Sequence, residues 1–170
     1  MTNTELAPSP FTVRSGGGVP DVSVVIPVYN EERTLEEVVR RTVAALDALA
    51  RPYEIIVIDD GSKDGTAAAL ATLSYPWLQV IRLAKNAGKA NALNVGLQCV
   101  RFGLTVTVDG DSYLYRNALS NLVGRYLSDP PDTRAVAGAV LVRNSRHNLI
   151  TAAQEWDYFH GIAAIKRLQS

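Results

Sequence analysis

The chain has 170 residues, 47% of them hydrophobic, and its 17 Lys and Arg balance 17 Asp and Glu. This is enough apolar material for the core of one globular domain, and the zero net charge argues against nucleic-acid binding through a diffuse positive field. A single cysteine, Cys99, excludes a disulfide scaffold and favours a reducing, cytoplasmic compartment. The longest apolar run, residues 135–142, is far shorter than the roughly 18 residues that span a membrane, so no transmembrane segment is expected.

The first 20 residues differ in composition from the rest of the chain. Residues 1–20 mix Thr, Ser and Pro with three consecutive glycines and show no hydrophobic period, so we expect a flexible leader there. From residue 21 on, short apolar runs alternate with helical patterns, which predicts an α/β fold with a mainly parallel sheet and helices on both faces. The expected strands are residues 22–26, 53–58, 78–83, 104–108 and 135–142.

Helical spacing and helix-start signals separate these strands. Thr34 and Glu37 form a capping-box pattern before the first helix, and Asp64 can cap the second. The third helix is expected to start near Lys89, with Val100 on its apolar face. The other expected helical ranges are residues 35–50, 67–73, 117–127 and a last segment from about residue 148.

Polar side chains follow each of the first four expected strands. In an open parallel sheet the ligand site lies beyond the carboxyl ends of the strands, so chemistry is expected there. Any single aspartate at such a place could be a turn former or a helix cap, but two pairs at one edge favour a functional site. The four blocks are Pro27-Val28-Tyr29-Asn30-Glu31, Asp59-Asp60-Gly61-Ser62, Lys85-Asn86-Ala87-Gly88-Lys89 and Asp109-Gly110-Asp111.

The Asp109-Gly110-Asp111 block is a DxD pattern that suits a divalent cation. The two carboxylates flank a glycine, so both can converge on one hard cation while the backbone bends past it. Two carboxylates form an incomplete shell, which water and the phosphate oxygens of a substrate usually complete. The block therefore predicts Mg²⁺ or Mn²⁺ bound together with a nucleotide; the alternative is a simple turn at the strand end.

The other three blocks offer groups that suit a nucleotide. Tyr29 could stack against a base, and Asp59 or Asp60 could accept hydrogen bonds from a base N–H or a ribose hydroxyl. Lys89 follows Gly88 at an expected helix start, where a point charge and free backbone N–H groups suit a diphosphate. The alternatives are a core tyrosine, a tight turn and a solvated surface lysine.

Other site types are less well supported. The phosphate-loop and dinucleotide patterns, GxxxxGK[ST] and GxGxxG, do not occur in the sequence. Residues 60–65 imitate the start of a calcium-binding EF-hand loop, but Ala71 stands where a bidentate Glu is required. An aspartate-dependent phosphohydrolase built on Asp109 is a further hypothesis, which would leave the upstream blocks without a role.

Four blocks, residues 26–31, 59–62, 88–94 and 109–111, resemble in order and spacing those of the family 2 glycosyltransferases. The resemblance extends from about Val22 to the C-terminus and is nearest to synthases of hyaluronan, chitin oligosaccharides, cellulose and poly-N-acetylglucosamine. It implies the GT-A nucleotide-diphospho-sugar fold. It also implies an inverting transfer of a sugar, with N-acetylglucosamine suggested, from a UDP-sugar to a saccharide acceptor in polysaccharide or cell-surface glycan synthesis.

The resemblance also implies a role for each matching residue. The metal would stabilise the departing diphosphate, and Lys89 would approach the same group. In the family's terms, the nucleotide pocket would contain Pro27, Tyr29 and Glu31, the uridine would contact Asp59 or Asp60, the ribose and metal would contact Asp109, and the chief ligand of Mg²⁺ or Mn²⁺ would be Asp111.

The family's acidic general-base motif and its Gln-x-x-Arg-Trp motif do not occur here, so we expect the base beyond Ser170. Residues 21–170 are then the donor-binding, N-terminal part of a catalytic domain that is incomplete at its C-terminus, and the alternative is a nucleotide-sugar-binding fragment without catalysis. The apolar spacing of Trp156, Phe159 and Ala163 predicts a last helix covered by the missing part. A full-length form could associate with the cytoplasmic face of a membrane.

Overall fold

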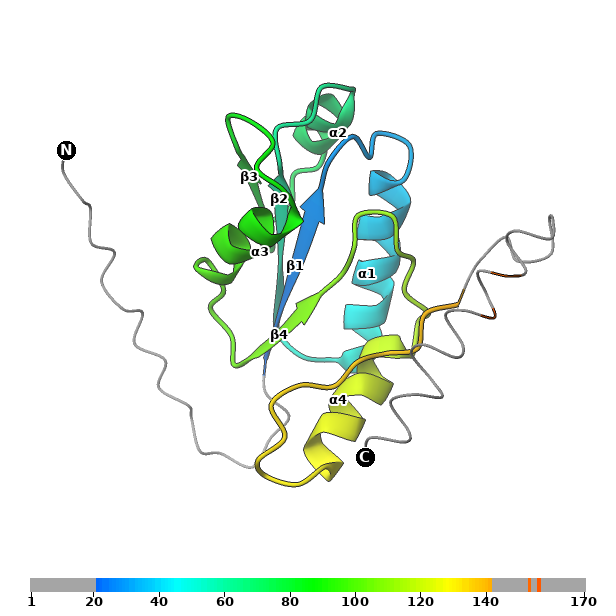
Figure 1. The fold of residues 1–170 in the computed structure, drawn as a ribbon. Coiled ribbons are helices and arrows are strands. Elements are labelled where there is room, and N and C mark those ends of the chain that lie inside the picture. The colour runs from blue at the N-terminus through cyan, green and yellow to red at the C-terminus, as the bar shows by residue number, and fades with distance from the viewer. Residues whose placement is uncertain (1–20, 142–152, 154–155, 157–170) are drawn as a thin grey trace, which may run out of the picture. The chain divides into compact units, whose positions relative to one another are not determined.

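The computed structural model describes residues 21–141, together with Ala153 and Trp156. The described residues fall into two compact units, which divide after Asn121. Helices and strands alternate along the chain, which confirms the predicted α/β class (Figure 1). The elements are β1 (Val22–Val28), α1 (Leu35–Leu49), β2 (Tyr53–Asp59), α2 (Thr66–Thr72), β3 (Leu78–Arg82), α3 (Lys89–Leu97), β4 (Leu104–Thr107) and α4 (Ala118–Ser128).

The four strands form one parallel sheet in the order β3-β2-β1-β4. The connections from β1 to β2 and from β2 to β3 run one way along the sheet, and the connection from β3 to β4 runs back across β2 and β1. Because crossovers between parallel strands are right-handed, the first two helices and the third lie on opposite faces. Accordingly α1 contacts α2, whereas α3 packs on β1 and β2 from the other face (Figure 1). The predicted helices on both faces are confirmed.

Both faces of the central strands are buried. All seven residues of β1 are buried, as expected for a parallel strand covered on both sides. On the face of α3, the core contains Val25, Ile56, Ile58 and Ala92. On the other face, α1 buries residues at helical spacing, and each leucine or valine among them contributes about 1.5–3 kcal/mol by leaving water. The buried residues are Leu35, Val38, Val39, Thr42, Ala45 and Leu46.

The predicted capping box at the start of α1 is wrong. Thr34 is the residue before the helix, but its side chain makes no capping hydrogen bond. Glu37 instead accepts hydrogen bonds from Arg40 Nε at 2.7 Å and from Arg41 Nε at 2.6 Å, and these two arginines lower its pKa to about 2. The carboxylate is thus taken by cations on its own helix face, which compete with the backbone.

The expected strand over residues 135–142 is also not found. Residues 133–141 adopt no regular secondary structure, and Val140 and Leu141 are exposed. An apolar run indicates burial, but a strand also needs a partner for its backbone hydrogen bonds, and the run pairs with no strand among the described residues. The third helix ends at Leu97, so Val100 lies beyond it.

Some expected segments lie outside the described residues. These are the leader over residues 1–20, Val142, and most of the last helix, of which Ala153 and Trp156 are described and helical. In the part of the chain that the structure describes, none of the helices has the length and apolarity that crossing a membrane requires.

Candidate functional site

A pocket of about 350 Å³ lies in the first unit, beyond the carboxyl ends of β1, β2 and β4. This is the edge of the sheet at which the sequence predicted a ligand site. All four expected blocks contribute residues to the pocket, and the Asp109-Gly110-Asp111 block lines it in full. The lining residues are Pro27, Val28, Tyr29, Glu31, Asp60, Asn86, Lys89, Ala92, Asp109, Gly110 and Asp111.

Gly110 allows the aspartates to flank the end of β1. A Cβ atom at this position would lie 2.9 Å from Val28 Cγ1 and 3.1 Å from the carbonyl oxygen of Pro27, so a larger residue would push the segment away. Gly110 is buried, whereas Asp109 and Asp111 on either side of it are exposed and line the pocket. The bend therefore presents two carboxylates on one wall.

Lys89 is paired with one of these carboxylates. Its Nζ lies 2.5 Å from Asp109 Oδ1, and the two side chains remain 59% and 49% exposed. Lys89 is the first residue of α3, and Asp109 lies two residues past the end of β4. The ion pair therefore joins two elements across the pocket.

Asp60 fixes the loop that leads into α3. Its Oδ1 accepts a hydrogen bond from the N–H of Ala87 at 2.9 Å, and its Oδ2 accepts one from the N–H of Gly88 at 2.8 Å. Gly88 has a φ of +90°, a conformation that L side chains rarely adopt. Asp60 is only 3% exposed, so it sets the backbone from which the Lys89 side chain extends.

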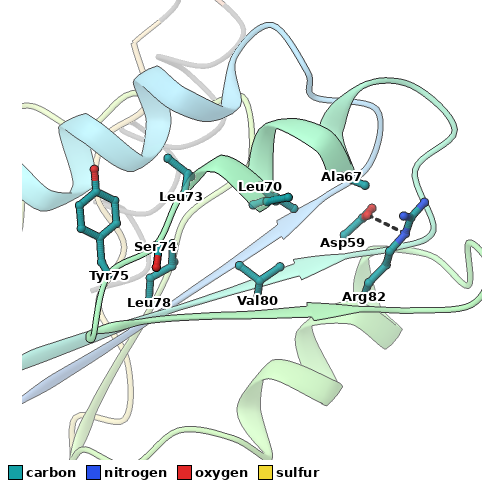
Figure 2. A pocket seen from close by; sticks show the side chains of 10 residues that line it. Asp59, Ala67, Leu70, Leu73, Ser74, Tyr75, Leu78, Val80 and Arg82 are labelled. Carbon is teal, nitrogen blue, oxygen red and sulfur yellow. Dashed lines mark ion pairs between the residues drawn. The ribbon is translucent and has the colours of Figure 1, made fainter.

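Asp59 does not line this pocket. It is fully buried, and its Oδ1 accepts a hydrogen bond from the N–H of Ser62 at 2.8 Å. Its Oδ2 lies 3.3 Å from Arg82 Nε, which stands opposite it in the β2–β3 register. Figure 2 shows this ion pair at one end of a second hollow, between α2 and β3. Of the two aspartates proposed for the uridine, only Asp60 reaches the pocket.

The alternation of strand side chains explains why the two neighbours separate. Successive residues of a strand point to opposite faces. Ile56 and Ile58 pack on the face of α3, and the hydrogen bond from the N–H of Asp60 to the carbonyl of Val28 continues the ladder. Asp60 therefore lies on the α3 face with them, and Asp59 lies on the other. The alternation of side chains along β2 is visible in the sequence and could have separated Asp59 from Asp60.

The second hollow is larger, at about 420 Å³, but offers less chemistry. Apart from the paired Asp59 and Arg82, its lining is mostly apolar. Its side chains include Leu70, Leu73 and Val80 (Figure 2). Size alone therefore does not identify the functional site.

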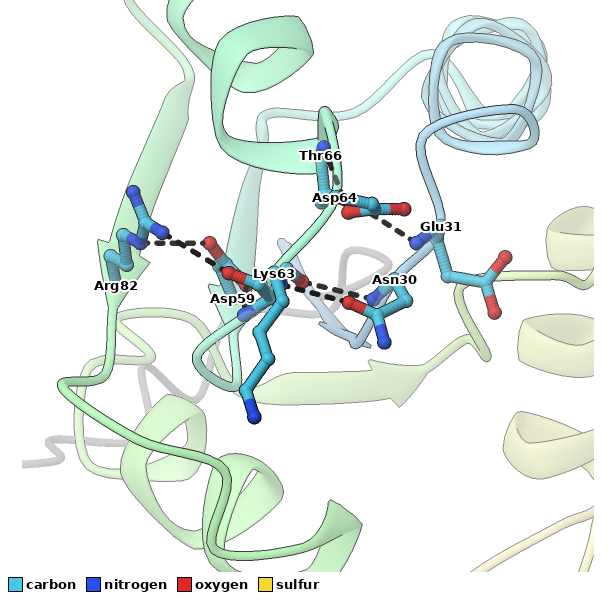
Figure 3. A network of polar contacts seen from close by, with 8 residues as sticks. Asn30, Glu31, Asp59, Lys63, Asp64, Thr66 and Arg82 are labelled. Carbon is cyan, nitrogen blue, oxygen red and sulfur yellow. Dashed lines mark hydrogen bonds and ion pairs between the residues drawn. The ribbon is translucent and has the colours of Figure 1, made fainter.

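A polar network holds the loops that carry the site (Figure 3). The N–H of Asn30 donates to Ser62 Oγ at 3.0 Å, the N–H of Lys63 donates to Asn30 Oδ1 at 2.9 Å, and the N–H of Glu31 donates to Thr66 Oγ1 at 2.8 Å. These bonds join the segment after β1 to the segment after β2. Asn30 adopts a φ of +57°, which asparagine tolerates better than most residues.

The start of α2 belongs to the same network. Asp64 Oδ1 accepts hydrogen bonds from the hydroxyl and the backbone N–H of Thr66, the first residue of α2. These donors hold the pKa of Asp64 below its usual value, the hydroxyl more than the N–H. The residue before α2 is Gly65, with no side-chain capping hydrogen bond, so the predicted cap by Asp64 is not found, although Asp64 binds the first residue of the helix.

Two residues near the pocket were given no role in the site from the sequence. The Thr34 hydroxyl lies 2.5 Å from Glu31 Oε2 and 3.1 Å from the carbonyl oxygen of Gly110, so it links the loop after β1 to the Asp-Gly-Asp bend. Asn86 lines the pocket beside Lys89. The sequence suggested only a capping role for Thr34. Its contact with Gly110 joins residues 76 positions apart, so no local pattern could predict it.

The site offers a cation few protein ligands. Among the described residues, no group of three His, Cys, Asp or Glu side chains is placed to hold a metal ion. Asp109 and Asp111 supply the hard carboxylate oxygens that Mg²⁺ and Mn²⁺ prefer, and water or a ligand would complete the shell. The glycine bend and the two exposed carboxylates fit a metal of this kind.

Comparison with known proteins agrees with this geometry. The family model for glycosyl transferase family 2 matches residues 23–168. The curated relatives include the undecaprenyl-phosphate 4-deoxy-4-formamido-L-arabinose transferases of Shewanella sediminis and Sodalis glossinidius. They are 41% identical over 107 residues and 45% identical over 93 residues, which cover 61% and 53% of this chain. The chain spans about a third of the length of these relatives, 32% and 28%.

Solved structures show the same fold. A mannosyltransferase from Pyrobaculum calidifontis, solved with GDP-Man and Mn²⁺, matches with a TM-score of 0.57 and 29% identity over 67% of this chain and 34% of that one. Staphylococcus aureus TarS, residues 1–349 with UDP-GlcNAc, matches with a TM-score of 0.55 and 22% identity over 73% and 41%. The predicted GT-A fold is thereby confirmed. Since the family model matches most of the residues, the chain belongs to glycosyl transferase family 2.

Proposed function

We propose that the pocket binds a nucleoside diphosphate sugar, with UDP as the nucleotide, and that the chain is the donor-binding part of an inverting glycosyltransferase. One observation carries the proposal: a single pocket at the sheet edge combines a lysine, a buried carboxylate and two exposed carboxylates on a glycine bend. The mannosyltransferase that is 29% identical to this chain was solved with a nucleotide sugar and Mn²⁺, which supports it.

Different lining residues would contact different parts of the donor. Tyr29, 40% exposed at the end of β1, offers an aromatic face to the base, next to Pro27 and Glu31. Asp60 has lone pairs to spare for a base N–H, because each of its oxygens accepts one hydrogen bond from the loop. Lys89 and the N–H groups at the start of α3 suit the diphosphate.

Asp109 and Asp111 would hold Mg²⁺ or Mn²⁺ together with the diphosphate. A cation bound there supplies Lewis-acid stabilisation of the negative charge on the leaving diphosphate. In the transfer, an acceptor oxygen bonds to the anomeric carbon while the bond from that carbon to the diphosphate oxygen breaks, and the diphosphate leaves with the electron pair. Lys89 then faces the charge that the leaving group gains.

The sequence suggested a saccharide acceptor, but the curated relatives favour a different one. The curated relatives are named for transfer to undecaprenyl phosphate, and not as polysaccharide synthases. A phosphate monoester has its second pKa near 6, so its oxygen is anionic at neutral pH and needs no carboxylate to remove a proton. We therefore favour a polyprenyl phosphate acceptor, and a saccharide hydroxyl would require a base that the described residues do not identify.

Calorimetric titration of the purified chain with UDP, with and without Mn²⁺, tests the donor site. We expect UDP to bind in the presence of Mn²⁺, and the variant D109A/D111A to lose that binding while its circular dichroism remains unchanged. A parallel titration with GDP tests the choice of base, because GDP is the nucleotide of the mannosyltransferase complex.

The proposal fails if a folded chain binds neither UDP nor GDP with Mn²⁺ present. Binding of GDP alone would replace UDP as the donor nucleotide and keep the site. The acceptor is tested separately in the full-length protein, by supplying radiolabelled donor with either a polyprenyl phosphate or an oligosaccharide. Label transferred to the oligosaccharide alone would overturn the phosphate acceptor.

A further inference from the structure

The ion pair between Lys89 and Asp109 gives the site a property that neither residue has alone. The Lys89 ammonium lies 2.5 Å from Asp109 Oδ1, at the place where a divalent cation would be held. Lys89 is thus the counter-ion of one of the two carboxylates that the proposed metal site requires.

We infer that Lys89 is an internal cation that a divalent metal must displace from Asp109, so that diphosphate and metal bind with positive coupling. This inference rests on the proposed donor site and describes how that site is regulated. While Lys89 neutralises Asp109, a metal meets one free carboxylate and a nearby positive charge. Once a diphosphate draws Lys89 away, Asp109 is released for the metal.

The backbone on both sides of the ion pair is fixed, so the exchange of Lys89 for a metal at Asp109 needs only a side-chain movement. Asp60 holds the N–H groups of Ala87 and Gly88 at 2.9 and 2.8 Å, so the residue before α3 is fixed. On the other side, the contact of Gly110 with Val28 and the hydrogen bond from Thr34 fix the bend that carries Asp109. Only the lysine side chain, which is 59% exposed, needs to move.

The size of the effect follows from the exposure of the pair. Exposed ion pairs are worth about 0–1 kcal/mol, which corresponds to at most about fivefold in affinity. Repulsion between the ammonium and a divalent cation adds to this, and salt screens both contributions because the pair is exposed. Removing the lysine charge should therefore raise the metal affinity of the nucleotide-free chain about three- to tenfold.

The test is a titration of the whole chain with Mn²⁺ in the absence of nucleotide, read by the electron paramagnetic resonance signal of free Mn²⁺. We expect Lys89→Gln to bind Mn²⁺ about three to ten times more tightly than the parent chain. Lys89→Arg retains the charge and should bind as the parent does. Lys85→Gln removes an exposed lysine of the same loop that does not line the pocket, and should change the affinity less than about twofold.

The second half of the experiment measures the coupling itself, as the ratio of the UDP affinities with and without Mn²⁺. Lys89→Gln should weaken UDP binding and reduce this ratio, because the release of Asp109 no longer depends on the diphosphate. Unchanged or weaker Mn²⁺ binding by Lys89→Gln, or no Mn²⁺ binding by any variant, overturns the inference.

Failure of the donor proposal gives a different result. A parent chain that binds no UDP with Mn²⁺ present contradicts the donor site. The manganese titration does not use nucleotide, and tighter binding by Lys89→Gln would still establish the displacement of Lys89 by the metal.

Discussion

At the scale of single residues, Asp60 has a wider role than a contact with a base. Both of its oxygens already accept backbone N–H groups, from Ala87 and Gly88. A carboxylate oxygen has two lone pairs, so support of the loop and a contact with a nucleotide are compatible. The residue therefore positions Lys89 whether or not a ligand is bound.

Asp60→Asn tests this support. The amide can accept one of the two hydrogen bonds, but it presents a donor to the other N–H, so we expect the loop to loosen and UDP affinity to fall about tenfold or more, as for an unsatisfied buried group. Hydrogen exchange at the amides of Ala87 and Gly88 should accelerate. Unchanged protection of both amides would contradict the positioning role, and a loss confined to UDP, with GDP binding unaffected, would indicate a base contact alone.

The same pair of aspartates shows where prediction from the sequence stops at this scale. The block Asp59-Asp60 placed two carboxylates after β2 without deciding between them. The decision comes from strand parity, since Asp60 shares the α3 face with Ile56 and Ile58. The partner of Asp59 could not be predicted in the same way, because Arg82 reaches it through the pairing of β2 with β3.

At the scale of elements, a buried polar network holds the amino end of β4. Near its amino end, the buried Glu54 accepts hydrogen bonds from Ser23 Oγ at 2.6 Å, from the N–H of Arg101 at 2.7 Å and from Arg101 Nε at 2.6 Å. Ser23 in turn accepts from the N–H of Phe102 at 3.1 Å. This network ties the segment entering β4 to β1 and β2, and so helps to place the Asp-Gly-Asp bend that follows β4.

Truncation of Glu54 should therefore be costly. Glu54→Ala leaves the buried Ser23 hydroxyl and the part-buried backbone N–H of Arg101 without their acceptor, and we expect a loss of about 2–4 kcal/mol in the free energy of unfolding. Arg101→Ala should cost only about 1 kcal/mol, because this arginine is 68% exposed and its backbone N–H is retained.

Urea denaturation followed by circular dichroism measures both losses. Glu36→Ala is the matched control, since Glu36 is an exposed acid in the first turn of α1 and should change stability by less than about 0.5 kcal/mol. A loss for Glu54→Ala no larger than that of the control would contradict the network's role.

Helices and strands were predicted well where a local sequence pattern is sufficient. They were predicted less well where the structure depends on which groups are available as hydrogen-bond or ion-pair partners. The ends of β1 to β4 fall within two residues of the predicted ends, because β-branched runs bounded by turn residues are a local signal. Residues 135–141 carry a similar apolar run but pair with no strand among the described residues. The capping box at Thr34 failed for the same reason, since Arg40 and Arg41 take the carboxylate of Glu37.

At the scale of the whole molecule, the position of the site was predictable from topology alone. Once the strands are parallel, their carboxyl ends share one edge, and the blocks that follow β1, β2 and β4 must meet there. The contacts within the site were not predictable, because the pairing of Lys89 with Asp109 depends on where α3 begins relative to β4. The sequence predicts which residues lie at this edge of the sheet. Which of their side chains form ion pairs depends on the three-dimensional packing.

A ligand at this edge should stabilise the molecule as well as fill a pocket, because it would bridge groups from β1, β2, α3 and β4. Binding to the folded state alone adds about 2.7 kcal/mol when the ligand is at a hundred times its dissociation constant, which corresponds to a rise in Tm of about 10 °C for a domain of this size. Thermal unfolding with Mn²⁺ and UDP together should show this rise, and D109A/D111A should not. If calorimetry detects binding but Tm stays constant, the nucleotide does not bind to the cooperatively folded sheet, and the assignment of the donor site to its carboxyl edge is wrong.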